Sequence, residues 1–188
     1  MGLNSVFTRT NTLLIIIDIQ EKLAKTMSGL DCVVKNTIKL IRAARLLQVP
    51  IMVTEQYPEG LGRTLPELES LLINAEPIEK LTFSCCLEER FNNALSIESR
   101  SHIIIAGMEA HICVLQTALD LRERGYVAGV VQDAVCSYNR NDMDAALNRM
   151  RDEGVKILTT EMVLYELLRR AGTDEFKALL PLLKDRDR

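Results

Sequence analysis

Two uninterrupted apolar segments constrain the fold of this chain more than any other feature. One runs from Leu13 to Asp18 as Leu-Leu-Ile-Ile-Ile-Asp, and the other runs from His102 to Gly107 as His-Ile-Ile-Ile-Ala-Gly. A strand with one solvated face alternates apolar and polar residues, whereas an unbroken β-branched run suits a strand buried on both faces of a parallel sheet. We therefore expect a parallel sheet with helices on each side.

Other segments alternate between strand-like and helix-like patterns. Further strands are expected at Pro50 to Thr54, Pro77 to Phe83, Tyr126 to Gln132 and Val155 to Leu158. Helices are expected at Asp31 to Gln48, with Asp31 as N-cap, and at Leu65 to Leu72, Leu87 to Leu95, Ile112 to Arg124, Asn141 to Glu153, Glu161 to Arg170 and Glu175 to Leu183. This order predicts an α/β fold with a doubly wound, mainly parallel six-stranded sheet and helices on both faces.

Length and charge narrow the class of protein. The 188 residues suit one domain, residues 1–188, and the net charge of -3 with dispersed Lys and Arg predicts no nucleic-acid partner. The apolar run near the start is shorter than the roughly 20 residues that cross a bilayer, and no cleavage site follows it. We expect no membrane association and a cytoplasmic location, with a mitochondrial or other organellar location left open.

The cysteines and histidines do not form a metal-binding pattern. No C-x-x-C pair occurs among the five cysteines, and the chain has only two histidines. We expect free thiols in a reducing compartment, no metal site and no cofactor. A thiol redox protein is disfavoured, because the adjacent Cys85 and Cys86 are poorly spaced for a resolving pair.

Three reactive side chains fall where ligands bind to open α/β sheets, at the carboxyl ends of the strands. Asp18 ends the first strand, Lys80 lies late in the third, and Cys113 begins the helix after the fourth. A thiol in a first helical turn is expected to favour the thiolate, and Asp18 can act as a general base. The alternatives are a core cysteine, a capping aspartate and a solvated lysine. Lys80 must lean inward, because its strand is about 10 Å from the first.

The segments around these residues resemble the isochorismatase-like cysteine hydrolases. Ile16 to Gln20 is similar to the family's D-x-Q opening, Glu79 to Ser84 to its lysine segment, and Gly107 to Val114 to its nucleophile loop. Val53 to Gly62 resembles the corresponding segment of the small isochorismatase-domain proteins. The resemblance spans nearly the whole chain.

The resemblance implies metal-independent hydrolysis of a C–N or ester-like bond in a small-molecule substrate, through a Cys-Asp-Lys triad and an acyl-enzyme. It also implies a cis peptide bond between Met108 and Glu109, oxyanion donors at the amides of Glu109 and Cys113, and a homo-oligomer. Candidate substrate-binding residues are Gln20, Gln56, Tyr57 and Met108.

Departures from the family pattern leave alternatives open. Glu55-Gln56-Tyr57 stands where nicotinamidases have an Asp-x-His zinc pattern, and Arg63 is the one obvious cation for a dicarboxylate. The loop from Gln56 to Arg63 is a candidate lid. His111 is either an acid or base, or a loop side chain placed by packing. The main alternative to an enzyme is a binding or scaffold protein that retains the fold without turnover.

Overall fold

The structure is a computed structural model that describes residues 6–73 and 75–184. Its six strands form one parallel sheet in the order β3-β2-β1-β4-β5-β6, which confirms the expected doubly wound α/β fold. The strands are β1 (Thr12–Ile17), β2 (Ile51–Gln56), β3 (Ile78–Lys80), β4 (His102–Met108), β5 (Val127–Cys136) and β6 (Lys156–Leu158).

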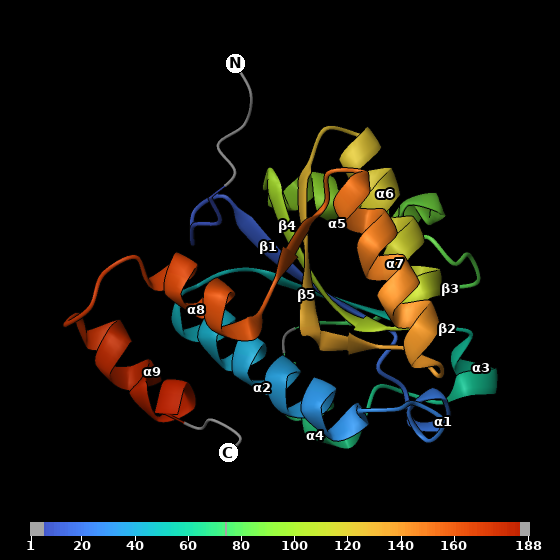
Figure 1. Ribbon diagram of the computed structural model, residues 1–188, viewed down its shortest axis with the longest axis horizontal. Coiled ribbons are helices and arrows are strands. Elements are labelled where there is room, and N and C mark those ends of the chain that lie inside the picture. Colours follow the sequence, from blue (N-terminus) through green and yellow to red (C-terminus); the bar gives the residue numbers. More distant parts are fainter. Residues whose placement is uncertain (1–5, 74, 185–188) are drawn as a thin grey trace.

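Helices cover both faces of the sheet (Figure 1). One layer holds α2 (Leu30–Leu46), α4 (Pro66–Glu69), α8 (Thr160–Leu168) and α9 (Asp174–Lys184), and the other holds α5 (Glu89–Glu98), α6 (Leu115–Glu123) and α7 (Arg140–Asp152). Alternate residues of β1 pack into two hydrophobic cores, one on each face of the sheet. Leu14 and Ile16 lie on the α2 side, and Leu13, Ile15 and Ile17 lie on the α6 side. This double burial explains why the run is apolar at every position.

Several element boundaries differ from those expected. The first long helix begins at Leu30 with Gly29 at the N-cap position, so Asp31 lies in the first turn rather than capping it. The third strand stops at Lys80 instead of Phe83, because the chain bends there and turns the carbonyls of Thr82 and Phe83 toward the Lys80 ammonium. Two short helices, α1 (Glu21–Ala24) and α3 (Pro58–Leu61), were not expected.

The segment after β4 also departs from a plain α-helix. The expected helix from Ile112 to Arg124 is a π-helical turn, Ala110–Val114, followed by α6. Next to it, β5 runs on to Cys136 rather than ending at Gln132, with a register shift against β4 between Ile105 and Gly107. The irregular turn therefore lies at the carboxyl edge of the sheet.

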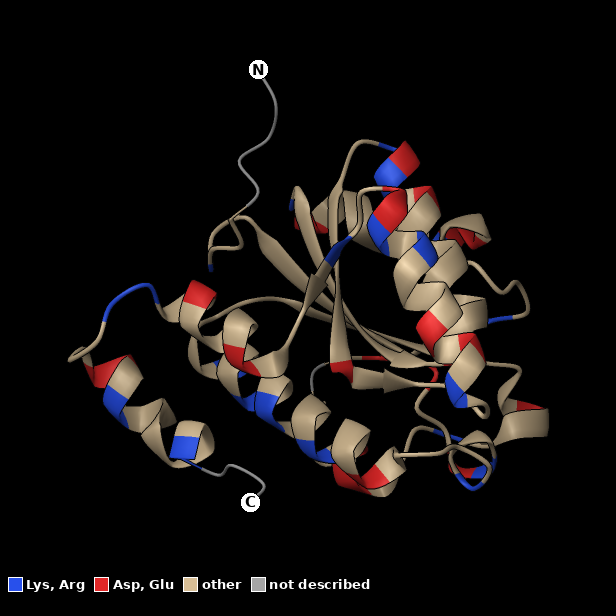
Figure 2. Ribbon diagram, viewed as in Figure 1, with Lys and Arg blue, Asp and Glu red and all other residues tan. Residues whose placement is uncertain are grey.

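Lys and Arg alternate with Asp and Glu over the helices, and no continuous basic stripe is visible in the view of Figure 2. In the described part of the chain, no helix is both long and apolar enough to cross a membrane.

Candidate functional site

The candidate site lies where the strand order reverses, between β1 and β4. Asp18 follows β1 directly, and the turn that carries Cys113 follows β4. Gly107 is paired with Ile17 at this point and has a φ of 136°. A Cβ atom on Gly107 would lie 2.1 Å from the Ile17 carbonyl oxygen, so only glycine lets the two strand ends approach this closely.

Asp18 and Lys80 form a buried ion pair at the base of the site. The Lys80 Nζ atom lies 2.7 Å from Asp18 Oδ2, and both side chains have no exposed surface. Thr54, at the carboxyl end of β2, donates its hydroxyl to Asp18 Oδ1 over 2.7 Å. Burial is the largest single influence and lowers the pKa of Lys80, but the charge of Asp18, the neighbouring Cys85 and Cys113 and the hydrogen bond with Asp18 together outweigh it, so that the pKa of Lys80 is raised. The Lys80 ammonium and the Thr54 hydroxyl thus each donate to one carboxylate oxygen of Asp18.

The Lys80 side chain reaches from β3 across β2 to Asp18, so it leans inward as expected from the sequence. Its ammonium also donates to Gln56 Oε1 over 2.7 Å and approaches the carbonyl oxygens of Thr82 at 3.3 Å and Phe83 at 3.4 Å. An ammonium has three protons to donate. The protein itself thus supplies acceptors for all of them.

Cys113 lies against this pair and is 6% exposed. Its Sγ atom is 3.9 Å from Gln56 Oε1, the oxygen that Lys80 also contacts. The pKa of Cys113 is raised, first by burial and then by the charge of Asp18 and a hydrogen bond with it, while Lys80 lowers it. The expected thiolate is therefore wrong for the resting protein, because burial and a neighbouring carboxylate outweigh the helix end. The raised pKa of Cys113 favours the thiol over the thiolate.

The turn before Cys113 is held from several sides. The peptide bond between Met108 and Glu109 is cis. The Glu109 carbonyl accepts hydrogen bonds from the amides of Ile112 at 3.1 Å and Val114 at 3.2 Å, the neighbours of Cys113 on either side. The Glu109 carboxylate accepts from the Tyr138 amide at 2.9 Å. This bonding fixes the backbone around the thiol.

His111 lies in the same turn but is bound elsewhere. Its Nδ1 atom is 2.9 Å from the Ser137 hydroxyl, in the loop between β5 and α7. The contact ties two loops of the carboxyl edge together and supports the interpretation of His111 as a loop side chain.

The four expected substrate-binding residues separate into two groups. Gln56 is in the site, and Tyr57 is 48% exposed beside it, with its amide donating to the Lys80 carbonyl over 2.9 Å. Met108 is fully buried in the core on the α2 side of the sheet, which contradicts a substrate-binding role for its side chain. Gln20 is also fully buried and bonds to backbone groups, so it belongs to the scaffold.

The expected lid loop is tied down. Gln20 accepts from the Gln56 amide at 2.7 Å and donates to the carbonyls of Gln56 and Gly62 at 3.0 and 2.7 Å. On the other side of the loop, Glu55 accepts from the Thr64 amide and hydroxyl at 2.7 and 2.8 Å. A loop held at these points is a fixed wall of the site rather than a lid.

Sequence reasoning missed Thr54 and gave Cys85 no part in the site. The Cys85 Sγ atom is 3.9 Å from the Thr54 hydroxyl, and burial followed by the charge of Asp18 raises the pKa of Cys85 to about 12. The available signal was a hydroxyl at the carboxyl end of the apolar strand β2, because such a group needs a buried hydrogen-bond partner.

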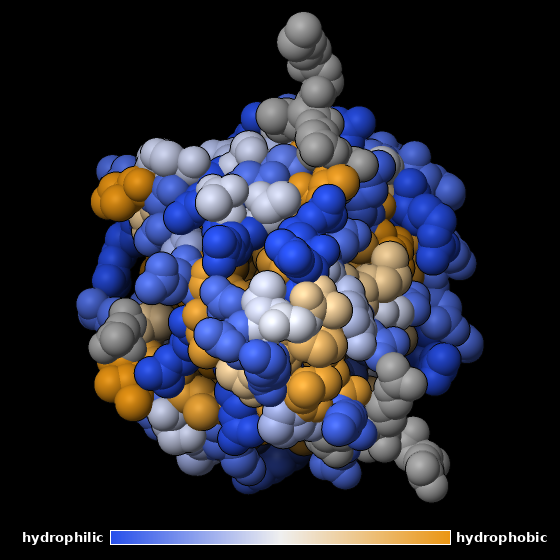
Figure 3. Space-filling model, turned by 90° about the vertical axis from the view of Figure 1, so that its left-hand side faces the viewer, coloured by the Kyte–Doolittle hydropathy of each residue, from blue (hydrophilic) through white to orange (hydrophobic). Residues whose placement is uncertain are grey.

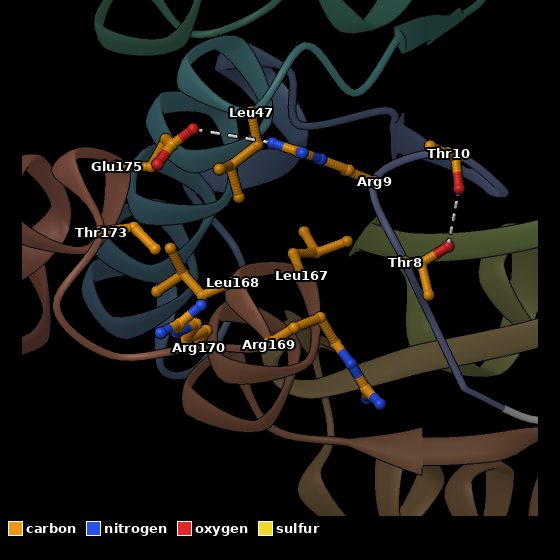
Figure 4. A pocket seen from close by; sticks show the side chains of 10 residues that line it. All are labelled: Thr8, Arg9, Thr10, Leu47, Leu167, Leu168, Arg169, Arg170, Thr173 and Glu175. Carbon is orange, nitrogen blue, oxygen red and sulfur yellow. Dashed lines mark hydrogen bonds and ion pairs between the residues drawn. The ribbon is translucent and has the colours of Figure 1, made fainter.

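A separate pocket lies among the N-terminal segment, the end of α2 and the turn between α8 and α9. It has a volume of about 340 Å³, and Arg9 extends across it toward Glu175 at 3.6 Å (Figure 4). The face of the molecule with α8 and α9 shows small apolar patches separated by hydrophilic side chains (Figure 3). This pocket contains no cysteine among its lining residues and is distinct from the site around Cys113.

Comparisons with known proteins agree with the fold and with the expected family. Residues 12–162 match the family model of the isochorismatase domain. The chain is 41% identical to isochorismatase family protein 1B of Dictyostelium discoideum, over 92% of this chain and 86% of the relative. It is 38% identical to isochorismatase domain-containing protein 2 of Danio rerio, over 97% and 91%.

Two solved structures have nearly the same fold. The MAR1 ribonuclease of Caenorhabditis elegans is 37% identical with a TM-score of 0.90, over 97% of this chain and 95% of that one. The YcaC protein of Escherichia coli, an octameric hydrolase of unknown specificity, is 25% identical with a TM-score of 0.89, over 97% and 91%.

Proposed function

Because the chain belongs to the isochorismatase family, we propose that it is a hydrolase that cleaves a C–N or ester-like bond of a small molecule with Cys113 as nucleophile. Family membership and the hydrolase among its structural relatives support the reaction class. The observation that carries the assignment of residues is the position of the Cys113 Sγ atom, 3.9 Å from the Gln56 oxygen that also accepts from Lys80 of the buried Asp18–Lys80 pair.

The first half of the proposed reaction forms an acyl-enzyme. The Asp18 carboxylate takes the Cys113 proton as the sulfur attacks the substrate carbonyl, so a free thiolate is not needed beforehand. Lys80, 2.7 Å from Asp18 Oδ2, orients the carboxylate. Collapse of the tetrahedral intermediate breaks the C–N or C–O bond, and the leaving group receives the proton from Asp18.

The second half releases the acid. Water attacks the thioester while Asp18 again takes a proton, and the Cys113 sulfur leaves and recovers its proton from Asp18. The oxyanion of both intermediates is assigned to the backbone amides of Glu109 and Cys113, because the first amides of a helical segment are available donors. The rigid bonding around the Glu109 carbonyl supports this assignment.

A covalent trap tests the nucleophile. We expect incubation with p-nitrophenyl butyrate to add a butyryl group to Cys113, detected by mass spectrometry of peptides after acid quenching. Cys113→Ala should abolish the adduct and the turnover. Cys32→Ala is the matched control, because Cys32 is an exposed cysteine outside any disulfide and far from Cys113 in the sequence, and it should leave both unchanged. Turnover that persists in Cys113→Ala would remove the proposed mechanism.

A binding or scaffold role is the alternative to an enzyme. It would be favoured if a panel of small amides and esters gave neither turnover nor a Cys113 adduct.

Ribonuclease activity is a second candidate, because the C. elegans relative carries that name. The net charge of -3 and the dispersion of Lys and Arg along the sequence do not favour RNA binding. Cleavage of a labelled RNA that disappears in Cys113→Ala would replace the small-molecule proposal.

A further inference from the structure

We propose that the site accepts an uncharged substrate with an apolar acyl group and discriminates against anionic ones. This inference rests on the proposed cysteine hydrolysis and names its substrate class. It is carried by the way in which other groups of the protein already occupy two cations that an anion could otherwise use, Lys80 and Arg63.

The first cation, Lys80, has no donor to spare for a substrate. Its ammonium contacts Asp18 Oδ2 and Gln56 Oε1, both at 2.7 Å, and the carbonyl oxygen of Thr82 at 3.3 Å. These acceptors use the three protons of an ammonium. A substrate carboxylate would have to displace one of them, and displacing Asp18 would disable the proposed base.

The second cation, Arg63, is held on the other face of the sheet. Its Nη1 atom donates to Glu55 Oε2 at 2.9 Å and to Glu79 Oε1 at 2.6 Å. Side chains alternate between the faces of a strand, so Glu55 and Glu79 point away from the face that carries Gln56 and Lys80. The two glutamates neutralise Arg63 at a place from which it cannot reach the thiol.

The surroundings of the thiol add negative charge and apolar surface. Glu109 carries a carboxylate on the loop that holds Cys113. On the β3 side, Tyr57, Leu81 and Phe83 are 48%, 74% and 55% exposed. The Tyr57 amide donates to the Lys80 carbonyl, and the carbonyls of Phe83 and Leu81 accept from Lys80 and Gln56, respectively. On this basis we assign these three side chains to the entrance of the site.

An anionic acyl group would therefore lose its hydration beside the Asp18 carboxylate without gaining an unpaired cation. A desolvated charge with no partner is strongly disfavoured. An apolar acyl group of the same size avoids this cost and can contact the exposed apolar side chains.

A matched pair of esters tests the inference. p-Nitrophenyl butyrate and p-nitrophenyl hemisuccinate have acyl chains of similar length, and the second ends in a carboxylate. We expect kcat/KM for the butyrate to exceed that for the hemisuccinate by about tenfold or more, after each is divided by its rate of alkaline hydrolysis. Turnover by Cys113→Ala is subtracted as background. Equal values would overturn the inference.

Placing a cation at the entrance provides a second, independent test. Phe83→Arg, or Leu81→Arg if the first variant folds poorly, should raise the ratio of hemisuccinate to butyrate turnover several-fold. Ile97→Arg is the control, because Ile97 is 80% exposed at the end of α5 that leads into the start of β4, away from the carboxyl ends of the strands, and it should leave the ratio unchanged.

The results separate the two proposals. If neither ester acylates Cys113, the proposed function fails and the inference falls with it. If Cys113 is acylated but the hemisuccinate reacts as well as the butyrate, the hydrolase stands and the preference for uncharged substrates is wrong. The inference would also be contradicted if Phe83→Arg and Ile97→Arg changed the ratio of hemisuccinate to butyrate turnover by the same factor.

Discussion

The buried pair of Lys80 and Asp18 makes each residue dependent on the other. Replacing Lys80 by Met leaves the Asp18 carboxylate buried without its cation, and we expect the free energy of unfolding at pH 7 to fall by about 3–5 kcal/mol. Urea unfolding followed by circular dichroism measures the change. The double variant Lys80→Met/Asp18→Asn should regain part of the loss. A single variant within about 1 kcal/mol of the wild type would show that the pair is not desolvated.

Thr54 is a positioning residue in the proposed mechanism, since its hydroxyl holds Asp18 Oδ1 at 2.7 Å. Thr54→Val removes that donor and keeps the side-chain shape. We expect kcat to fall about tenfold with KM nearly unchanged, because the thiol proton acceptor loses its orientation. Thr54→Ser should restore kcat in steady-state assays. A fall in kcat for Thr54→Val that serine does not restore would indicate a packing defect instead.

The sequence predicted which residues form the site better than it predicted their protonation states and hydrogen-bond partners. Asp18, Lys80 and Cys113 are identifiable because strand ends in an open α/β sheet converge. The protonation of Cys113 could not be predicted, because it depends on burial and on the nearness of Asp18, which only the packed sheet defines. For the same reason, Gln20 next to Asp18 suggested a ligand contact although its partners are backbone groups.

Gln20 joins elements on either side of the site. Its amide bonds to both backbone groups of Gln56 at the end of β2 and to the Gly62 carbonyl after α3. Gln20→Leu would leave these buried groups unpaired, and we expect a loss of about 2–4 kcal/mol in unfolding free energy. Gln132→Leu, at an exposed position of β5, is the matched control and should change little. Equal denaturation midpoints for the two variants would rule out the bracing role.

Long apolar elements were predictable from the sequence, whereas short elements at the sheet edges were not. β1 and β4 carry short apolar runs rich in β-branched isoleucine, which favour buried strands. β3 has three residues, and its end is determined by the turn that directs carbonyls to Lys80. The extension of β5 to Cys136 depends on pairing with β4 across a register shift. Both boundaries follow from tertiary contacts that leave no local pattern.

For the whole molecule, the buried thiols predict a loss of stability at alkaline pH. Burial raises the pKa of Cys85 to about 12, of Cys86 to about 11 and of Cys136 to about 12, from an ordinary value of 9.0. Above pH 9 the unfolded chain loses these protons while the folded chain keeps them. Stability should therefore be intact below pH 9 and fall by up to about 1.4 kcal/mol per pH unit for each thiol between pH 9 and the folded pKa values.

Urea midpoints at intervals from pH 7 to pH 10.5 measure this dependence. Cys86→Ala removes one titrating thiol, so its stability should decline less steeply above pH 9. Cys32→Ala removes an exposed thiol and should keep the wild-type slope. A wild-type protein whose stability is flat between pH 9 and 10.5 would contradict the assigned pKa directions.

Assembly into a homo-oligomer stays a prediction for this chain, although the E. coli relative is octameric. Light scattering coupled to size-exclusion chromatography should give a mass that is a multiple of the monomer. A monomer at all micromolar concentrations would contradict it.

The shortness of the outermost strands limits how such copies can meet. β3 and β6 have three residues each and carry the exposed charged residues Glu79 and Lys156. So little unpaired backbone offers a poor template for continuing the sheet into a neighbouring molecule, and it also guards against fibril-like stacking. We therefore expect copies of this chain to contact one another through helices and loops, without pairing between strands of different molecules.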